Sequence, residues 1–243
     1  MEFTLSTVAL ARTPFREKFG IPRQAGLVPV RGRIDMLPPW DQPEALNGLE
    51  QVSHIWLDFI FHQNPSKPEQ LSVRPPRLGG NRRLGVFATR ASFRPNRLGA
   101  SLVKLEAVCV EAGNVHLEVS GIDLLDGTPI VDIKPYLPYA DRIDDAVNAI
   151  APAAPVPTLA VDWQAQALLA CRACLQELGY VGGLSGDGLC EIEQQVMQLV
   201  ALDPRPAYKQ SSCGTYAMSV FGLNVRWVMQ TPTQASISDV SLA

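Results

Sequence analysis

Seven arginines lie close together in residues 73–99, a stretch that contains no Asp or Glu. They are Arg74, Arg77, Arg82, Arg83, Arg90, Arg94 and Arg97. A guanidinium group presents a planar set of donors that matches carboxylate and phosphate, and it stacks on bases. Many arginine-rich stretches are only solvated loops. Here the arginines flank an apolar segment, residues 84–88, which we interpret as a strand, so the sequence favours an anion-binding site built on a sheet.

The rest of the chain is acidic. The whole protein has 21 Lys and Arg against 24 Asp and Glu, a net charge of -3. Without the seven arginines and Lys104 the remainder would carry -11. This balance excludes a protein that coats nucleic acid indiscriminately, and it indicates one focused basic face.

The cysteines give no sign of a metal site. Cys171 and Cys174 form one C-x-x-C within a helical pattern, and neither a second pair nor a suitably spaced histidine completes it. We therefore expect free thiols and no metal. No signal-peptide pattern and no apolar run of about 18 residues occurs, so the sequence predicts a cytoplasmic protein without a membrane span.

Short apolar–polar alternations separated by turns fill the first 140 residues. The predicted strands are 3–12, 28–37, 53–62, 84–88, 101–110, 115–124 and 129–134, with a short helix at 44–49. One core face is expected to combine Val103, Leu105 and Ala107 with Val115, Leu117 and Val119. So many short strands with hardly a helix predict an antiparallel barrel or sandwich.

Residues 151–158 (APAAPVPT) form a predicted stiff linker between a first domain, residues 1–150, and a second, residues 159–243. Beyond the linker the apolar period becomes helical. Trp163, Cys171 and Leu178 mark one helix, and residues 192–200 mark another. A strand pair is predicted on either side of residues 221–224, and the polar end from Thr231 is expected to fray. The second domain is therefore predicted to be small and α+β.

Polar clusters stand at the ends of the first-domain strands. They are Pro22-Arg23-Gln24, His62-Gln63, Thr89-Arg90, Arg94-Pro95-Asn96 and the turn Asp126-Gly127-Thr128-Pro129. Asp126 is equally well explained as a turn residue, and His62 as a surface histidine. P-loop, dinucleotide-binding, nucleophile-elbow and HExxH motifs are absent.

Taken together, these clusters resemble a known family, the tRNA (adenine(37)-N6)-methyltransferases, whose members methylate N6 of threonylcarbamoyl-adenosine beside the anticodon. The resemblance rests on EKFGIPRQAGL, SHIWLDFIFHQ, VRPPRLGGN, GVFATRASFRPNRLG and DLLDGTPIVDIKPYLP, all before residue 140, and on DPRPAY (203–208) and NVRW (224–227) in the second domain. No motif of the family is found between residues 140 and 188.

The resemblance implies a β-barrel methyltransferase that uses S-adenosylmethionine without a Rossmann sheet, works on tRNA and forms a homodimer. The cofactor contacts it implies are Pro22, Arg23, Gln24, His62, Gln63, Arg90, Leu98, Asp126, Gly127, Thr128 and Pro129. Arg90 or Arg23 suits the cofactor's carboxylate, and an Asp suits its ribose.

Asp203 and Tyr208 are the candidate catalytic residues. The arginines assigned to tRNA are Arg74, Arg77, Arg82, Arg94, Arg97 and Arg205. An alternative for the DPRPAY motif is a helix stop, because Asp-Pro often ends an apolar helix.

Two other functions stay open at this point. A barrel that grips RNA without catalysis would need aromatic residues among the arginines, and only Phe87 and Phe93 qualify. A methyltransferase of the same fold acting on a small molecule is the other. Cofactor binding separates the first alternative from a tRNA methyltransferase, and dependence of turnover on RNA separates the second.

Overall fold

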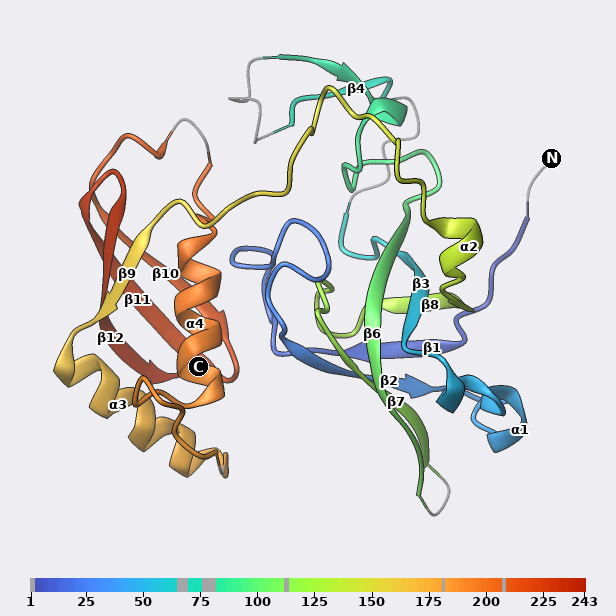
Figure 1. Cartoon of the computed structure of the whole chain (residues 1–243), viewed down its shortest axis with the longest axis horizontal. Coiled ribbons are helices and arrows are strands. Elements are labelled where there is room, and N and C mark those ends of the chain that lie inside the picture. Colours follow the sequence, from blue (N-terminus) through green and yellow to red (C-terminus); the bar gives the residue numbers. More distant parts are fainter. Residues whose placement is uncertain (1–2, 65–69, 76–81, 112–113, 181, 207–208) are drawn as a thin grey trace. The chain divides into compact units, whose positions relative to one another are not determined.

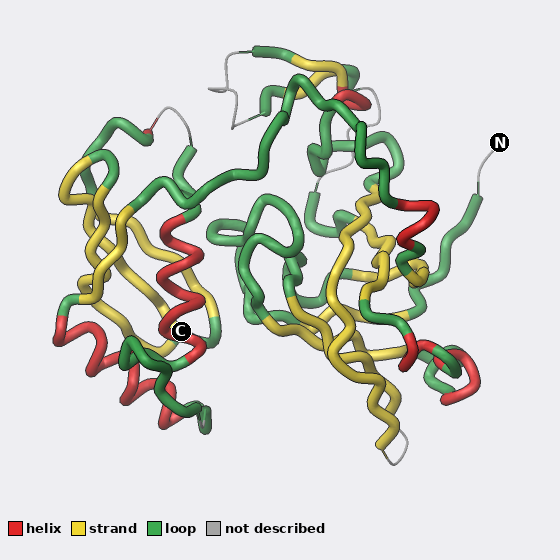
Figure 2. Tube along the Cα trace, in the orientation of Figure 1, coloured by secondary structure: helices red, strands yellow, loops and turns green. Residues whose placement is uncertain are grey.

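The computed structural model describes the chain except residues 1–2, 65–69, 76–81, 112–113, 181 and 207–208 (Figure 1). It divides into two compact units that are interleaved in sequence. The barrel unit consists of Met1–Thr13, Gln24–Leu71 and Arg90–Val156; the sheet unit consists of Pro14–Arg23, Ser72–Thr89 and Pro157–Ala243. Strands outnumber helices in both units (Figure 2).

The barrel unit is a closed, wholly antiparallel barrel in the order β1-β2-β7-β6-β3-β8. Its strands are β1 (Ala9–Arg12), β2 (Arg31–Met36), β3 (His54–Ile60), β6 (Leu98–Glu111), β7 (Asn114–Ser120) and β8 (Pro129–Pro135). The short helical pieces are α1 (Pro43–Leu46), η1 (Leu49–Gln51) and α2 (Pro138–Asp141). The predicted fold class, an antiparallel barrel followed by a small α+β part, is confirmed.

Alternation along β3 separates the inside of the barrel from its outer surface. Ile55, Leu57 and Phe59 are buried, while Trp56 and Asp58 are partly exposed. Burying side chains of this size stabilises the fold by about 1.5–3 kcal/mol each. The alternation of apolar residues that predicted this strand therefore matches the alternation of buried and partly exposed side chains in β3.

A β-bulge interrupts the same alternation in β6. Leu105 pairs with Val119 of β7, but Ala107 pairs with Glu118 where an unbroken ladder would place Leu117. The extra residue shifts the rest of the strand by one position, and a shift of one residue exchanges the two faces. The prediction that Ala107 shares the core face of Val103 and Leu105 is therefore wrong.

In the sheet unit, a four-stranded sheet has the order β10-β11-β12-β9, with only β12 and β9 parallel. The elements are β9 (Ala160–Trp163), α3 (Ala165–Glu177), α4 (Glu191–Ala201), β10 (Thr215–Val220), β11 (Leu223–Thr231) and β12 (Gln234–Leu242). Trp163 ends β9 and lies outside α3, so the prediction that it marks the first helix is wrong. In the described part of the chain, no helix is long and apolar enough to span a membrane.

Two further sequence expectations are wrong. The chain after Thr231 does not fray, because it forms β12, which pairs on both sides and buries Ala235, Ile237 and Val240. Residues 84–88 are not one strand. β5 (Leu84–Gly85) forms only a two-residue ladder with β4 (Ser72–Val73), and a 3-10 turn, η3 (Val86–Ala88), follows with Phe87 exposed. The sequence of an apolar segment does not indicate which strand it pairs with or how its backbone turns. The apolar pattern of residues 84–88 therefore could not reveal the short ladder and the 3-10 turn.

Gly99 is required where β6 pairs with β3, because it lies directly opposite Phe59. A Cβ atom at this position would overlap the ring of Phe59, which is buried and packs edge-on against Phe61 with ring centroids 5.0 Å apart. We expect Gly99→Ala to destabilise the protein by about 1–3 kcal/mol through overpacking, measured by denaturant unfolding. Gly85→Ala is the control, because a Cβ atom there meets nothing within 4 Å. Equal stability of the two variants would contradict this packing.

Candidate functional site

A cavity of about 480 Å³ lies on the outer surface of the barrel unit, over β3 and β6. The floor of the cavity is formed by every second residue of these two strands, because alternate side chains of a strand point to the same face. The lining residues are Gln24, Ala25, Gly26, Pro29, His54, Trp56, Arg90, Ala100, Ser101, Leu102, Lys104, Ser120 and Gly121. The volume is within the range of pockets that hold small molecules and cofactors.

Two of the predicted cofactor residues meet at this cavity. The Arg90 guanidinium donates from Nη1 to Oε1 of Gln24 at 2.7 Å, although 66 residues separate them. Arg90 follows the turn η3 and its side chain is exposed, so the guanidinium keeps donors for an anion. The cavity therefore combines a fixed cation, an amide and the apolar side chains of Trp56 and Leu102.

A half-buried carboxyl group, that of Asp123, lies next to the cavity wall. Ser101 donates from Oγ to Oδ1 of Asp123 at 2.6 Å. Burial raises the pKa of Asp123, whereas the hydrogen bonds from Ser101 and the Ala25 backbone and the charge of Arg90 partly offset that rise. A carboxyl group with a raised pKa beside a cavity is characteristic of functional sites. The sequence reading missed it, although Asp123 opens the segment DLLDGTP that was used for the family resemblance.

His62 and Leu98 are not among the residues that line the cavity. Leu98 pairs with Ile60 at the start of β6, and Ala100, which lines the cavity, points to the same face two residues later. His62 lies two residues after the end of β3, and the Phe61 N–H before it donates to the Arg97 carbonyl at 2.8 Å. The described chain gives Gln63 no place in the lining either.

The turn from Asp126 to Pro129 is fastened to the first strand. Thr13 N–H donates to Oδ1 of Asp126 at 3.0 Å, and Gly127 N–H donates to the Ala11 carbonyl at 2.8 Å. Thr128 is buried, its hydroxyl donates to the Leu125 carbonyl, and Pro129 pairs with Leu10. In this structure the turn connects β8 to β1. Asp126 therefore acts as a turn residue, which is one of the two roles that the sequence left open for it.

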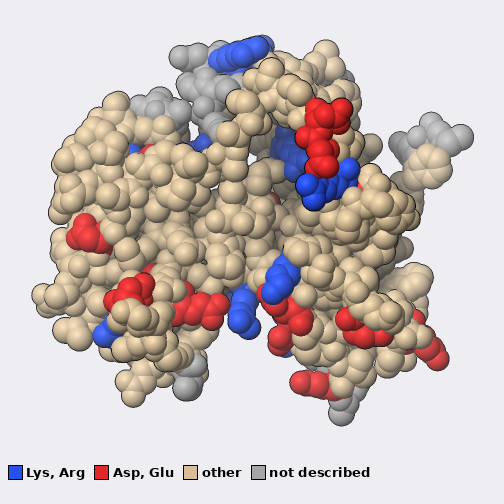
Figure 3. All heavy atoms as spheres, viewed as in Figure 1, with Lys and Arg blue, Asp and Glu red and all other residues tan. Residues whose placement is uncertain are grey.

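The remaining predicted contacts divide between the two units. Pro22 and Arg23 belong to the sheet unit, where Arg23 Nη2 donates to the Asp203 carbonyl at 3.5 Å. Among the arginines assigned to tRNA, Arg74 and Arg82 belong to the sheet unit, Arg94 and Arg97 belong to the barrel unit, and Arg77 lies outside the described residues. Figure 3 shows Asp and Glu beside several of the basic side chains on the face viewed.

Arg205 and Asp203 are buried together in the sheet unit. Arg205 is 0% exposed and binds Asp203 with two contacts, Nε to Oδ1 at 2.7 Å and Nη2 to Oδ2 at 2.9 Å. It also donates to the carbonyls of Ser212 and Pro232 and stacks over the ring of Tyr216. These contacts favour a structural role over catalysis or RNA binding. Tyr208, the other candidate catalytic residue, lies outside the described residues.

Comparison with known proteins places two family models on the chain. The tRNA-methyltransferase O (TrmO) N-terminal domain matches residues 10–142, and the TrmO C-terminal domain matches residues 157–242. A tRNA (adenine(37)-N6)-methyltransferase of Escherichia coli is 41% identical over 228 residues, covering 93% of this chain and 92% of that protein.

Two proteins from Pseudomonas aeruginosa are similar over the full length. RcsF, named as a candidate S-adenosylmethionine-dependent methyltransferase, is 48% identical over 243 residues and 99% of both chains. A crystal structure of TrmO superposes with a TM-score of 0.78 and 42% identity, covering 99% of this chain and 100% of that one.

We expect that breaking the buried Arg205–Asp203 pair lowers the free energy of unfolding by a large amount. Arg205→Ala leaves a buried carboxylate without its partner, which should cost about 3–5 kcal/mol, measured by denaturant unfolding. Arg226→Ala is a matched control, because Arg226 forms an exposed pair with Asp239 at 3.4 Å and should lose at most about 1 kcal/mol. A stable Arg205→Ala protein that had lost affinity for tRNA would instead support the RNA-binding role.

Asp123 predicts a stability that depends on pH. Because the fold raises the pKa of this carboxyl above its unfolded value, ionisation opposes folding, and the penalty appears as the pH rises through the folded pKa. Asp123→Asn should therefore melt at a higher temperature than the wild type at pH 7–8, and the difference should shrink towards about pH 4. Asp145→Asn, at an exposed site, is the control. A stability difference that grew on acidification would refute the assignment.

Proposed function

We propose that this chain, which belongs to the TrmO family of tRNA methyltransferases, transfers a methyl group from S-adenosylmethionine to N6 of the adenine at position 37 of tRNA. The Arg90–Gln24 cavity carries this proposal, since it is a ligand-sized site on the barrel and two residues implied as cofactor contacts meet there. The names of the E. coli and Pseudomonas relatives support the substrate and the cofactor.

The donor set of the cavity fits S-adenosylmethionine. That cofactor has an amino-acid carboxylate, polar ribose and adenine groups, and apolar surface. Arg90 suits the carboxylate as a charge-assisted donor, and Gln24 fixes the direction of the guanidinium. Trp56, Leu102 and Ala100 supply apolar surface, and Ser101 and His54 supply polar groups. When bound, S-adenosylmethionine provides a methyl group on a positively charged sulfur, ready for displacement.

The residues of the chain contribute mainly by positioning. Holding nucleophile and methyl donor in line replaces a bimolecular encounter and supplies much of the rate enhancement. In the displacement the N6–CH3 bond forms, the S–CH3 bond breaks, and the N6 proton must leave to a base or to solvent. We assign Asp123 a positioning role. Asp123 orients the Ser101 hydroxyl through a hydrogen bond, and its carboxyl group interacts electrostatically with Arg90.

The finer substrate is adenosine-37 that carries the threonylcarbamoyl group, as the sequence resemblance implies. That group withdraws electrons and makes the N6 proton more acidic, so a base removes the proton more easily and the nucleophilic anion of N6 forms more readily. Arg74, Arg82, Arg94 and Arg97 are proposed to bind the tRNA backbone, which makes affinity dependent on salt.

We also propose a homodimer that works in the cytoplasm. The barrel unit exposes Tyr139, Ile143 and Val147 within nine residues, at 87%, 66% and 92%. Clustered apolar side chains of this kind mark interaction surfaces, and a second copy would remove them from water. All five cysteines are free, which is usual in a reducing compartment.

The activity is tested by transfer of a labelled methyl group from S-adenosylmethionine to purified tRNA. We expect transfer to tRNA with adenine at position 37 and none when that base is replaced by guanine. Faster transfer to tRNA that carries the threonylcarbamoyl group would support the finer substrate, and equal rates would exclude it. Transfer that ignores the base at position 37 would contradict the proposed function.

Arg90→Ala should weaken binding of S-adenosylmethionine about ten- to a hundredfold, because one charge-assisted contact contributes about 1.5–3 kcal/mol. Isothermal titration calorimetry measures the affinity, and circular dichroism establishes that the variant is folded. Arg142→Ala, at an exposed position outside the cavity, is the control. A folded Arg90→Ala protein with wild-type affinity would place the cofactor elsewhere.

A further inference from the structure

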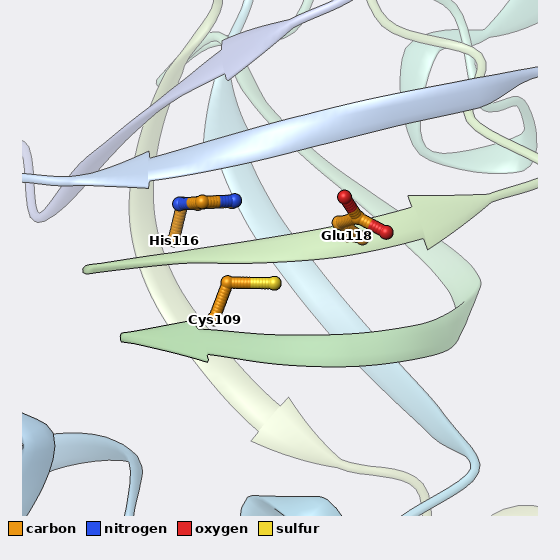
Figure 4. A group of neighbouring side chains, drawn as sticks. All are labelled: Cys109, His116 and Glu118. Carbon is orange, nitrogen blue, oxygen red and sulfur yellow. The ribbon is translucent and has the colours of Figure 1, made fainter. Parts of the chain in front are cut away.

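We propose that Cys109, His116 and Glu118 form a binding site for a divalent transition-metal ion of the Zn²⁺ type on the outer face of the β6–β7 hairpin. Their ligand atoms, a thiol sulfur, an imidazole nitrogen and a carboxylate oxygen, all lie within 4.8 Å of one another. Figure 4 shows the three side chains on the same side of the two strands. The site is separate from the Arg90–Gln24 cavity and does not depend on the proposed methyl transfer.

The β-bulge in β6 creates this arrangement. With an unbroken ladder from Leu105 opposite Val119, Cys109 would pair with Val115 and face the barrel interior. The extra residue between Leu105 and Ala107 makes Cys109 the partner of His116, so that thiol and imidazole share the outer face. Glu118 joins them because it lies two residues from His116 on the same strand. Bulges commonly re-aim side chains next to functional sites.

The imidazole of His116 points independently to a ligand. Only 5% of the residue is exposed, and Nδ1 has no hydrogen-bond partner. A buried polar atom without a partner costs free energy, so most such atoms in native proteins are satisfied by protein, water or an ion. A cation coordinated at Nδ1 would give this buried atom a partner.

The surrounding charges favour a cation. Burial, together with the charges of Glu118 and Glu111, raises the pKa of the Cys109 thiol, and the same two carboxylates attract a cation. On the neighbouring strand β2, Asp35 pairs with His116, and Arg12 and Arg33 both bind Asp35. Asp35 thereby offsets part of the positive charge of these two arginines.

The ligand types identify the metal class. Thiolate, imidazole and carboxylate together suit Zn²⁺, which takes four ligands in a tetrahedron at about 2.0–2.3 Å. Such ligands stand roughly 3.5 Å apart, so small rotations of Cys109 and the exposed Glu118 complete the site. Three protein ligands leave one position for water. Cys109 lies five residues along β6 from Lys104 at the cavity edge, about 16 Å away.

The test is a titration of the full-length, metal-free protein, without a histidine tag, with Co²⁺ as a spectroscopic substitute for Zn²⁺. We expect one equivalent of Co²⁺ to bind with a thiolate-to-cobalt absorption band that Zn²⁺ then removes. Cys109→Ser should abolish the band. Glu118→Gln, a change at an exposed side chain, should keep the band and weaken Co²⁺ affinity at least tenfold. Cys213→Ser is the control, because Cys213 is an exposed thiol outside the cluster.

Several results would overturn the site. They are absence of a thiolate band in the wild type, a band that persists in Cys109→Ser, loss of the band in Cys213→Ser, or unchanged affinity in Glu118→Gln. Circular dichroism of each variant separates loss of a ligand from loss of the fold, and Glu118→Gln provides a reading even if Cys109→Ser does not fold.

Discussion

The pairing of β6 with two different strands is the constraint on which the barrel depends. The first half of this 14-residue strand, Leu98 to Lys104, pairs with β3, and the second half, Lys104 to Glu111, pairs with β7. The single strand β6 therefore links β3 to β7 within the closed barrel. Every residue along it is assigned to the inside or the outside by alternation, until the bulge exchanges the two faces.

Two groups of chemically useful side chains follow from this geometry. Before the bulge, Ala100, Leu102 and Lys104 face outward and line the cavity that Arg90 and Gln24 complete. After the bulge, Cys109 faces outward beside His116. The barrel also holds Asp123, a half-buried carboxyl group next to the cavity, where loss of water raises its pKa.

Alternation in the sequence predicted an antiparallel barrel or sandwich, and the family resemblance specified the barrel. Ile55, Leu57 and Phe59 alternate along the predicted strand 53–62, and they form the buried face of β3. The bulge could not be predicted in the same way, because Leu105, Ala107 and Cys109 continue a regular period and only the pairing with β7 reveals the shift. Likewise the polar composition after Thr231 hid a strand whose stability comes from partners on both sides.

The residues that line the candidate cavity were named only in part from the sequence. Arg90 and Gln24 were both named from sequence, and the structure brings them together across 66 residues. Asp123 was not identified, because the sequence does not show which carboxyl group becomes desolvated when the chain folds. Arg205 was assigned to RNA from its place in the motif DPRPAY, yet it is fully buried against Asp203. Burial of a charged residue is a property of tertiary packing, and local composition does not contain it.

The central claim is that the Arg90–Gln24 cavity of the barrel is the cofactor site. A crystal structure of the protein with S-adenosylhomocysteine, the product of methyl transfer, tests it most directly. The account predicts density for the ligand in this cavity, with its carboxylate within hydrogen-bond distance of the Arg90 guanidinium. Density for the ligand at another place, with Arg90 and Gln24 still bound only to each other, would contradict it.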